Sequence, residues 1–189
     1  GAIDKKGYER LLNSPANLFK DPSFEEGSGW IVSGERNGKK FHVSRIEPGG
    51  IFGSKMATLD IPQKAPADWY GFRQSIHARD GAKYLFAGWV NSPSGLGTIW
   101  AHELSGNPGV KGFDNYNVQI SGKGWQPFTM EISARSKNSV IDAHLTAMHG
   151  VYHYDGMLLA EVADIHRLTA VLRAGDRRDD LRDHRAGDL

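Results

Sequence analysis

The feature that most constrains the fold of this chain is a series of short β-type runs, each ended by turn residues. Nine runs follow one another between residues 39 and 162: KKFHVSRI, KMATLDI, WYGFRQSIHA, KYLFAGWV, GTIWAHEL, YNVQI, WQPFTMEI, VIDAHLTA and VYHYDGMLLAEV. Most are separated by the turn-forming clusters EPGG, ARDG, SPSGLG, SGNPG and SGKG. Because no long helical pattern lies between the runs, we predict an all-β fold, an antiparallel β-sandwich or jelly roll.

Alternation along two of these runs predicts which side chains face the core. In the run at residues 140–147 the apolar side chains share one side of the strand: Ile141, Ala143, Leu145 and Ala147. Asp142 and His144 fall on the other side, and the same rule puts Trp100 and His102 on the polar side of the run at residues 97–104. An indole on a polar strand face points to a ligand, so we predict a binding surface there.

The two ends of the chain differ in character from the middle. Residues 1–16 hold one apolar turn of a short helix, which Pro15 ends, and we interpret them as a lead-in or linker. Residues 17–162 form the predicted β-sandwich. Residues 163–189 begin with a helical face and become almost entirely charged, which predicts a short helix and a charged tail, with a partner-binding helix as the alternative.

Charge and composition exclude several classes of function. The chain has 23 Lys and Arg residues against 22 Asp and Glu residues, so it lacks the basic field that holds a nucleic acid, and none is expected. No apolar run reaches the ~20 residues that span a bilayer, so no membrane partner is expected. The absence of Cys excludes disulfides and thiolate metal sites. The opening Gly-Ala is typical of a cloning remnant, and the residues after it lack the apolar core of a secretion signal.

Four blocks occur in order between residues 17 and 161: NLFKDPSFEEGSGW, then WYGFRQSI with GAKYLFAGWV, then GKGWQPFTMEI, then VYHYDGMLL. The first is similar to a signature of Asn-Leu, Asn-Pro-Ser-Phe-Glu and Gly-Trp. The others are similar to a Gln strand before a Gly-x-x-Tyr strand that ends in Trp-Val, a Gly-Trp-x-x-Phe strand and a closing Tyr-x-Asp-Asp strand. Together they resemble carbohydrate-binding modules of families 4, 9 and 22, which implies a galactose-binding-like jelly roll.

The resemblance also implies a structural calcium ion, which family members commonly hold between the first and last strands. The matching positions are Glu25 and Asp155. Carboxylate and carbonyl oxygens are the ligands that Ca²⁺ prefers, and a metal that joins the two ends of a domain adds its binding free energy to stability. Gly156 stands where the family often has a second Asp, so the other ligands would be backbone groups. In the alternative, Glu25 and Asp155 only cap turns.

A polysaccharide or oligosaccharide is the ligand that the resemblance implies. Sugars stack their C–H faces on aromatic rings and offer their hydroxyls to polar side chains. In family 22 a Trp before a Gly, here Trp69, looks like the stacking ring. The candidate ligand-binding residues are Trp69, Tyr70, Arg73, Gln74, Trp100, His102, Tyr116, Asp142 and His144. A surface ion pair is the alternative for Arg73, and a structural hydrogen bond for Gln74. The tryptophans of the signature blocks are predicted to be core residues: Trp30, Trp89 and Trp125.

Enzyme functions find less support in the sequence. The spacings of His144, His149 and His153 do not match a zinc motif. A glycoside hydrolase needs two carboxylates across a cleft, and no motif singles out a pair among Glu103, Glu131 and Asp142.

The favoured hypothesis is a non-catalytic carbohydrate-binding module, secreted or at the cell surface, that targets an attached polysaccharide-active enzyme to its glycan. One alternative is a galactose-binding-like spacer or interaction domain without sugar binding. A jelly-roll polysaccharide lyase or hydrolase is the other.

Overall fold

The structure, a computed structural model, describes residues 4–33, 35–36, 39–68, 70–104 and 113–170. Apart from helix α1 (Lys5–Leu12) and a helical stretch at residues 162–170, the described elements are strands. They are β1 (Ile31–Ser33), β2 (Glu35–Arg36), β3 (Lys39–Lys40), β4 (Ser44–Pro48), β5 (Lys55–Ile61), β6 (Tyr70–His77), β7 (Lys83–Leu104), β8 (Phe113–Ser133), β9 (Val140–Ala147) and β10 (Gly150–Glu161).

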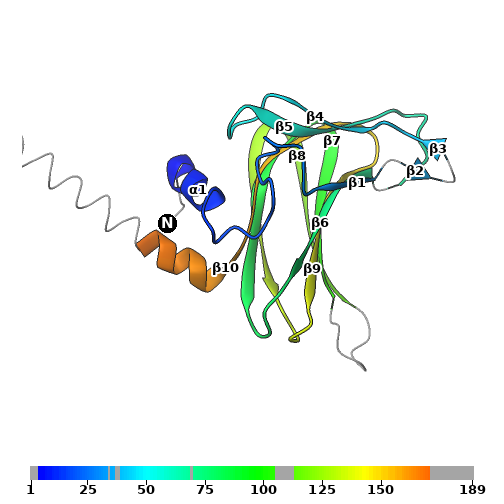
Figure 1. The fold of residues 1–189 in the computed structure, drawn as a ribbon. Helices are drawn as coiled ribbons and strands as arrows, with labels where there is room; N and C mark the ends of the chain where they lie inside the picture. The colour runs from blue at the N-terminus through cyan, green and yellow to red at the C-terminus, as the bar shows by residue number, and fades with distance from the viewer. Residues whose placement is uncertain (1–3, 34, 37–38, 69, 105–112, 171–189) are drawn as a thin grey trace, which may run out of the picture.

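Eight of the strands form an antiparallel sheet that wraps into two layers, and β2 and β3 form a separate two-stranded sheet. The order of the larger sheet is β1-β6-β9-β7-β10-β5-β4, and β8 pairs with β7 along nearly its whole length. The first part of β7 pairs with β10, whereas its second part pairs with β9. The β7–β8 hairpin therefore runs through both layers, with β1, β6 and β9 on one side and β4, β5 and β10 on the other (Figure 1).

Two predicted turns lie inside strands. The clusters at residues 92–97 and 121–124 were expected to separate strands, but they lie within β7 and β8. The β7–β8 ladder is irregular between Val90 and Leu96, where its register shifts twice. Glycine and proline here bend a continuous ladder from one layer to the other without ending it, as bulges do at sheet corners.

The core lies between the layers, and the predicted alternation is confirmed. The four apolar side chains of β9 predicted to face inward have no exposed surface, and Ile99 and Ala101 of β7 are equally buried. Tyr152 and Tyr154 of β10 contribute from the other layer to the same cluster. Both layers therefore turn one apolar side inward and leave the other side for polar groups.

The prediction of three core tryptophans is confirmed for Trp30 and wrong for the other two. Trp30 packs on the core, with its ring centroid 5.0 Å from that of Phe19. Trp89 and Trp125 are half-buried and lie outside the core cluster. Strand alternation explains this result, because the neighbours at positions 88, 90, 126 and 128 take the inward sides of β7 and β8.

The segment at residues 17–30 is a loop held by its own polar side chains. Asn17 donates to the carbonyl of Met157 and accepts from the N–H of Leu159, which fixes the segment to β10. Asp21 accepts from the backbone N–H groups of residues 26 and 28, and its carbonyl accepts from Trp30 Nε1. The signature block is therefore an anchor that joins the start of the fold to its last strand.

Residues before the signature block also pack on the sandwich. The Asp4 side chain caps α1 by accepting from the N–H of Gly7 at 2.7 Å. Leu11 and Leu12 are buried, and the Tyr8 hydroxyl donates to the Gly156 carbonyl. The helical stretch at residues 162–170 lies beside α1 (Figure 1), and its Ile165 joins the same small apolar cluster as Leu11. The predicted tail from residue 171 lies outside the described residues.

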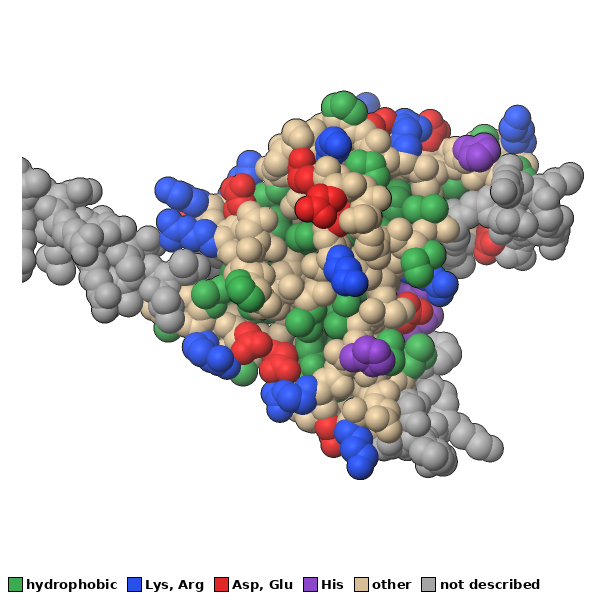
Figure 2. All heavy atoms as spheres, viewed as in Figure 1, with side chains coloured by type: hydrophobic (Ala, Val, Ile, Leu, Met, Phe, Trp, Pro, Cys, Tyr) green, Lys and Arg blue, Asp and Glu red, His purple; other side chains and the backbone are tan. Residues whose placement is uncertain are grey.

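Basic and acidic side chains are interspersed on the face of the molecule shown in Figure 2, without a broad patch of either sign. This distribution agrees with the formal net charge of +1. Within the described residues, no helix has the length and apolar character needed to cross a membrane.

Candidate functional site

The outward side of strands β6, β9 and β7 carries a group of polar and aromatic side chains that we name the polar face. Its members are Arg73, Ser75, Trp100, His102, Asp142 and His144. Antiparallel partners point to the same side of a sheet, and the register places Trp100 opposite His144 and His102 opposite Asp142. On the other flank of β9, Arg73 and Ser75 are opposite the same two residues.

Hydrogen bonds hold the centre of the polar face together. His144 Nε2 and Asp142 Oδ2 are 2.8 Å apart, and the Ser75 hydroxyl donates to Asp142 Oδ1 at 2.8 Å. The ring centroids of His102 and His144 are 5.3 Å apart, and those of Trp100 and His102 are 6.0 Å apart. An indole thus lies next to three hydrogen-bonding side chains, as a sugar site requires.

Electrostatics favour a neutral imidazole beside an ionised carboxylate. Burial lowers the pKa of His102 below its ordinary value, and His144 lowers it further, whereas the charge of Asp142 acts in the opposite direction. Burial alone would raise the pKa of Asp142, but the hydrogen bonds from His144 and Ser75, together with the charge of Arg73, lower it. At neutral pH Asp142 is therefore an acceptor for hydroxyl groups.

The same side chains form a possible metal-ligand group. One ligand atom from each of His102, Asp142 and His144 lies within 4.8 Å of the other two. Among the described residues, no other group of three or more His, Asp or Glu side chains meets this condition.

Four of the sequence-predicted ligand residues are not placed on the polar face. Tyr70 and Gln74 alternate with Arg73 on β6 and point into the core, with exposures of 2% and 6%. Tyr116 is opposite the buried Ala101 and packs on the core. Trp69 lies outside the described residues.

Strand alternation explains these positions. Residues 70 and 74 share one side of β6, and residue 73 lies on the other side. The Tyr70 hydroxyl donates to the Pro66 carbonyl, and Gln74 exchanges two hydrogen bonds with the backbone of Lys20. Gln74 therefore makes the structural hydrogen bonds that were its alternative role. The alternation that excludes it from the polar face also indicates Ser75, which our candidate set lacked.

The predicted calcium ligands lie on either side of one loop, residues 49–55. Glu25 Oε1 accepts from the N–H groups of Ser54 and Lys55 at 2.7 and 2.8 Å, and Glu25 Oε2 accepts from the Ser54 hydroxyl at 2.7 Å. These hydrogen bonds lower the pKa of Glu25, although burial opposes them. Gly53 leaves room for the contact, because a Cβ there would lie 2.4 Å from Glu25 Oε1.

Asp155 binds the same loop from β10 and has no exposed surface. Its Oδ2 accepts from the N–H groups of Ile51 and Phe52 at 2.8 and 3.0 Å, and its Oδ1 accepts from the N–H of Gly156 at 2.8 Å. Burial raises the pKa of Asp155 to about 7 despite these bonds, and the nearby charge of Glu25 raises it as well. We name Glu25, Asp155 and the loop between them the carboxylate clasp.

A cation at the carboxylate clasp would find few unused acceptor positions on the two carboxylates. Each carboxylate has about four acceptor positions, and the described hydrogen bonds use three on each. One position therefore remains on Glu25 and one on Asp155. Calcium takes six to eight oxygen ligands, so backbone carbonyls and water would have to supply the others.

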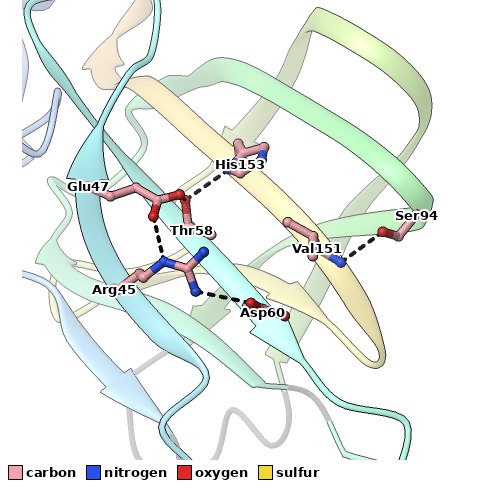
Figure 3. A network of polar contacts seen from close by, with 7 residues as sticks. All are labelled: Arg45, Glu47, Thr58, Asp60, Ser94, Val151 and His153. Atoms are coloured by element: carbon pink, nitrogen blue, oxygen red, sulfur yellow. Dashed lines mark hydrogen bonds and ion pairs between the residues drawn. The ribbon is translucent and has the colours of Figure 1, made fainter.

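The outward side of the second layer carries a separate polar network (Figure 3). Arg45 Nε lies 2.5 Å from Glu47 Oε2, and Arg45 Nη1 lies 3.2 Å from Asp60 Oδ2. The Thr58 hydroxyl links Glu47 to His153 through contacts of 2.8 and 2.9 Å. Arg45 of β4 thus pairs with Glu47 on the same strand and with Asp60 of β5, and these contacts are ion pairs at the protein surface.

The three carboxylates considered for a glycoside hydrolase do not face one another in the structure. Glu103 faces the core with no exposed surface and binds Arg135 and Ser139. Asp142 points to the opposite side of the sheet, and Glu131 is exposed beside Lys83. Of the three histidines considered for zinc, His149 contacts the Ala65 carbonyl and His153 contacts Thr58, so neither joins His144.

The fold is shared with solved carbohydrate-binding modules. A structure named Family 16 Carbohydrate Binding Module-2 has a TM-score of 0.59 at 13% identity and covers 77% of this chain and 100% of its own. The family 61 module TmCBM61, solved with β-1,4-galactotriose, has a TM-score of 0.52 at 16% identity and covers 77% and 98%. The family 22 and catalytic modules of Clostridium thermocellum xylanase 10B, solved with xylohexaose, have a TM-score of 0.51 at 11% identity and cover 77% and 27%.

These identities are low, so the similarity concerns the fold. The chain has the antiparallel β-sandwich jelly roll of carbohydrate-binding modules of the 4, 9 and 22 type, as its sequence blocks predicted. No protein-family model matches the sequence, and no curated protein matches it.

Proposed function

We propose that this protein is a non-catalytic carbohydrate-binding module whose polar face binds a polysaccharide or oligosaccharide. The observation that carries the proposal is the position of Trp100 beside His102, Asp142 and His144 on the outward side of a rigid sheet. A half-buried indole can receive the C–H face of a sugar ring, and the polar side chains can bind the hydroxyls around it. Trp69, which precedes β6 in the sequence, is proposed as a second stacking ring.

The open sheet surface favours internal segments of a glycan chain. The ligand residues project from three adjacent strands, and the exposed Arg73 extends the surface across β6. In the full-length protein, we propose that the module is secreted or at the cell surface and keeps an attached polysaccharide-active enzyme close to its substrate. Such a tether raises the effective concentration without any chemistry of its own.

We further propose that the carboxylate clasp binds a structural calcium ion through Glu25 and Asp155. Two carboxylates bind the same loop from either side, and one of them is buried with a raised pKa, so a bound cation would offset their negative charge. Calcium supplies charge neutralisation and a link between the two ends of the domain. Its removal should therefore lower the melting temperature.

Affinity electrophoresis against a panel of soluble polysaccharides, including xylan and β-1,4-galactan, tests sugar binding. Trp100→Ala should weaken retention at least about tenfold, which corresponds to ~1.4 kcal/mol, because it removes the stacking ring. Trp125→Ala is the matched control, since Trp125 is also half-buried but lies beside His153 on the other layer. Trp69→Ala should also reduce binding.

The outcome decides between the proposal and its alternatives. Equal loss in the Trp100 and Trp125 variants would place the site away from the polar face. Absence of retention across the whole panel would favour a spacer or interaction domain. Loss of polymer viscosity would favour a lyase or hydrolase.

A further inference from the structure

The centre of the polar face has the composition of a transition-metal site. His102 comes from β7, and Asp142 and His144 come from β9. Two imidazoles and one carboxylate suit borderline divalent cations such as Zn²⁺, whereas Ca²⁺ prefers oxygen ligands alone. This donor set differs in kind from that of the carboxylate clasp, which contains only oxygens.

The distances are close to those that a metal requires. Ligand bonds of 2.0–2.2 Å in a tetrahedral zinc site put neighbouring ligand atoms about 3.4 Å apart. Here the three ligand atoms lie within 4.8 Å of one another, and His144 Nε2 already lies 2.8 Å from Asp142 Oδ2. Small rotations of the side chains would bring the ligand atoms to this spacing, and the metal would replace the hydrogen bond between His144 and Asp142.

The strand segments that carry the three ligands are held in place by the core. Ala101 and Ala143, which adjoin them along the strands, are fully buried and oppose each other in the β7–β9 register. The Ser75 hydroxyl donates to Asp142 Oδ1, and a hydrogen bond of this kind orients a carboxylate that binds a metal. A ligand group on the central strands of a sheet is held more precisely than one on loops.

The group is also accessible. The side chains of His144 and Asp142 are 21% and 14% exposed, so an ion can enter and water can complete its coordination. Arg73 acts against a cation, because its positive charge lies near Asp142. Removing the charge of Arg73 should therefore strengthen metal binding, whereas removing a ligand should weaken it.

We propose that His102, Asp142 and His144 form a binding site for a divalent transition metal of the Zn²⁺ class, with at least one coordination position open to solvent. The proposal is argued from the three side chains and does not depend on sugar binding. The metal-binding experiment is therefore done without a glycan.

The experiment is isothermal titration calorimetry, in which Zn²⁺ is added to the tag-free protein in a buffer that does not coordinate metals. It measures the stoichiometry and the Kd of zinc binding. We expect one equivalent to bind, and His102→Ala and His144→Ala each to weaken binding at least tenfold. Arg73→Gln should tighten it. His77→Ala is the control, because His77 is exposed on the same side of β6 but outside the group, and its affinity should equal that of the wild type.

In the zinc titration, two results would overturn the proposal: no zinc binding by the wild type, or binding that persists unchanged in both histidine variants. Circular dichroism confirms that each variant is folded. A second measurement uses the wild type alone: bound Co²⁺ should give the visible spectrum of low-coordinate nitrogen and oxygen ligation, and excess Ca²⁺ should not displace it. Displacement of Co²⁺ by Ca²⁺ would also contradict the assignment.

Discussion

At the scale of single residues, Asp155 shows how burial and hydrogen bonding oppose each other in one carboxylate. Three backbone N–H groups stabilise its ionised form, but the loss of contact with water outweighs them and raises its pKa to about 7. The folded protein therefore binds this proton more tightly than the unfolded chain, in which an aspartate has a pKa of about 3.9. Without a bound cation, the ionised side chain costs stability at neutral pH.

The pH dependence of stability tests this. Because the pKa is raised in the folded state, the contribution of Asp155 is fully present below about pH 4 and is lost as the pH rises through about 7. In EDTA, the unfolding free energy of the wild type relative to Asp155→Asn should fall across this range. Urea denaturation at several pH values measures it, and curves that stay parallel would contradict the prediction.

At the scale of elements, the register of β6 on β9 decides which side chains share the polar face. Arg73 and Ser75 face His144 and Asp142 only in this register, and a slip by one residue would bring the core-facing Gln74 among them. Gly71 permits the close approach of the two strands, because a Cβ at this position would lie 1.9 Å from the Leu145 carbonyl oxygen. The contact is with backbone, which has little freedom to move.

Gly71→Ala should therefore disturb the pairing of β6 with β9. We expect a loss of about 1–3 kcal/mol in unfolding free energy, the usual range for overpacking, together with weaker glycan retention. His77→Ala on the same strand is exposed and should change stability by less than about 0.5 kcal/mol. Urea denaturation of both variants makes the comparison, and equal stability would show that the strands adjust without cost.

At the scale of the whole molecule, the carboxylate clasp connects segments that are far apart in the sequence. Glu25 belongs to the N-terminal anchor at residues 17–30, Asp155 belongs to the last strand, and both bind the loop at residues 49–55. A cation bound there would stabilise the folded state only, since the unfolded chain does not hold the two carboxylates together.

Calcium removal should lower the melting temperature by about 5–10 °C. A ligand at 100 times its Kd contributes about 2.7 kcal/mol, and each kcal/mol shifts a domain of this size by roughly 2–4 °C. Differential scanning calorimetry with EDTA, and then with Ca²⁺ restored, measures the effect, which Glu25→Gln should abolish. An unchanged transition, with no bound metal by elemental analysis, would refute the calcium proposal.

The sequence by itself determined the class of fold and much of its inside and outside. Turn clusters and strand alternation depend on local sterics, so they indicated the β-sandwich and the buried side of β9 without any knowledge of distant contacts. The same local rule would have assigned Tyr70 and Gln74 to the core. It would also have placed Trp89 and Trp125 on outward sides.

Only the tertiary structure decided which distant residues meet. Whether residues 92–97 and 121–124 end a strand or bend it depends on the ladder between β7 and β8, which alternation within one segment cannot specify. His102 meets Asp142 and His144 because β9 pairs with the second part of β7. Glu25 meets the loop that Asp155 also binds, because the first block is anchored to the last strand. Pairing across long separations is set by the cooperative packing of the core, and this is why the site emerged from the fold.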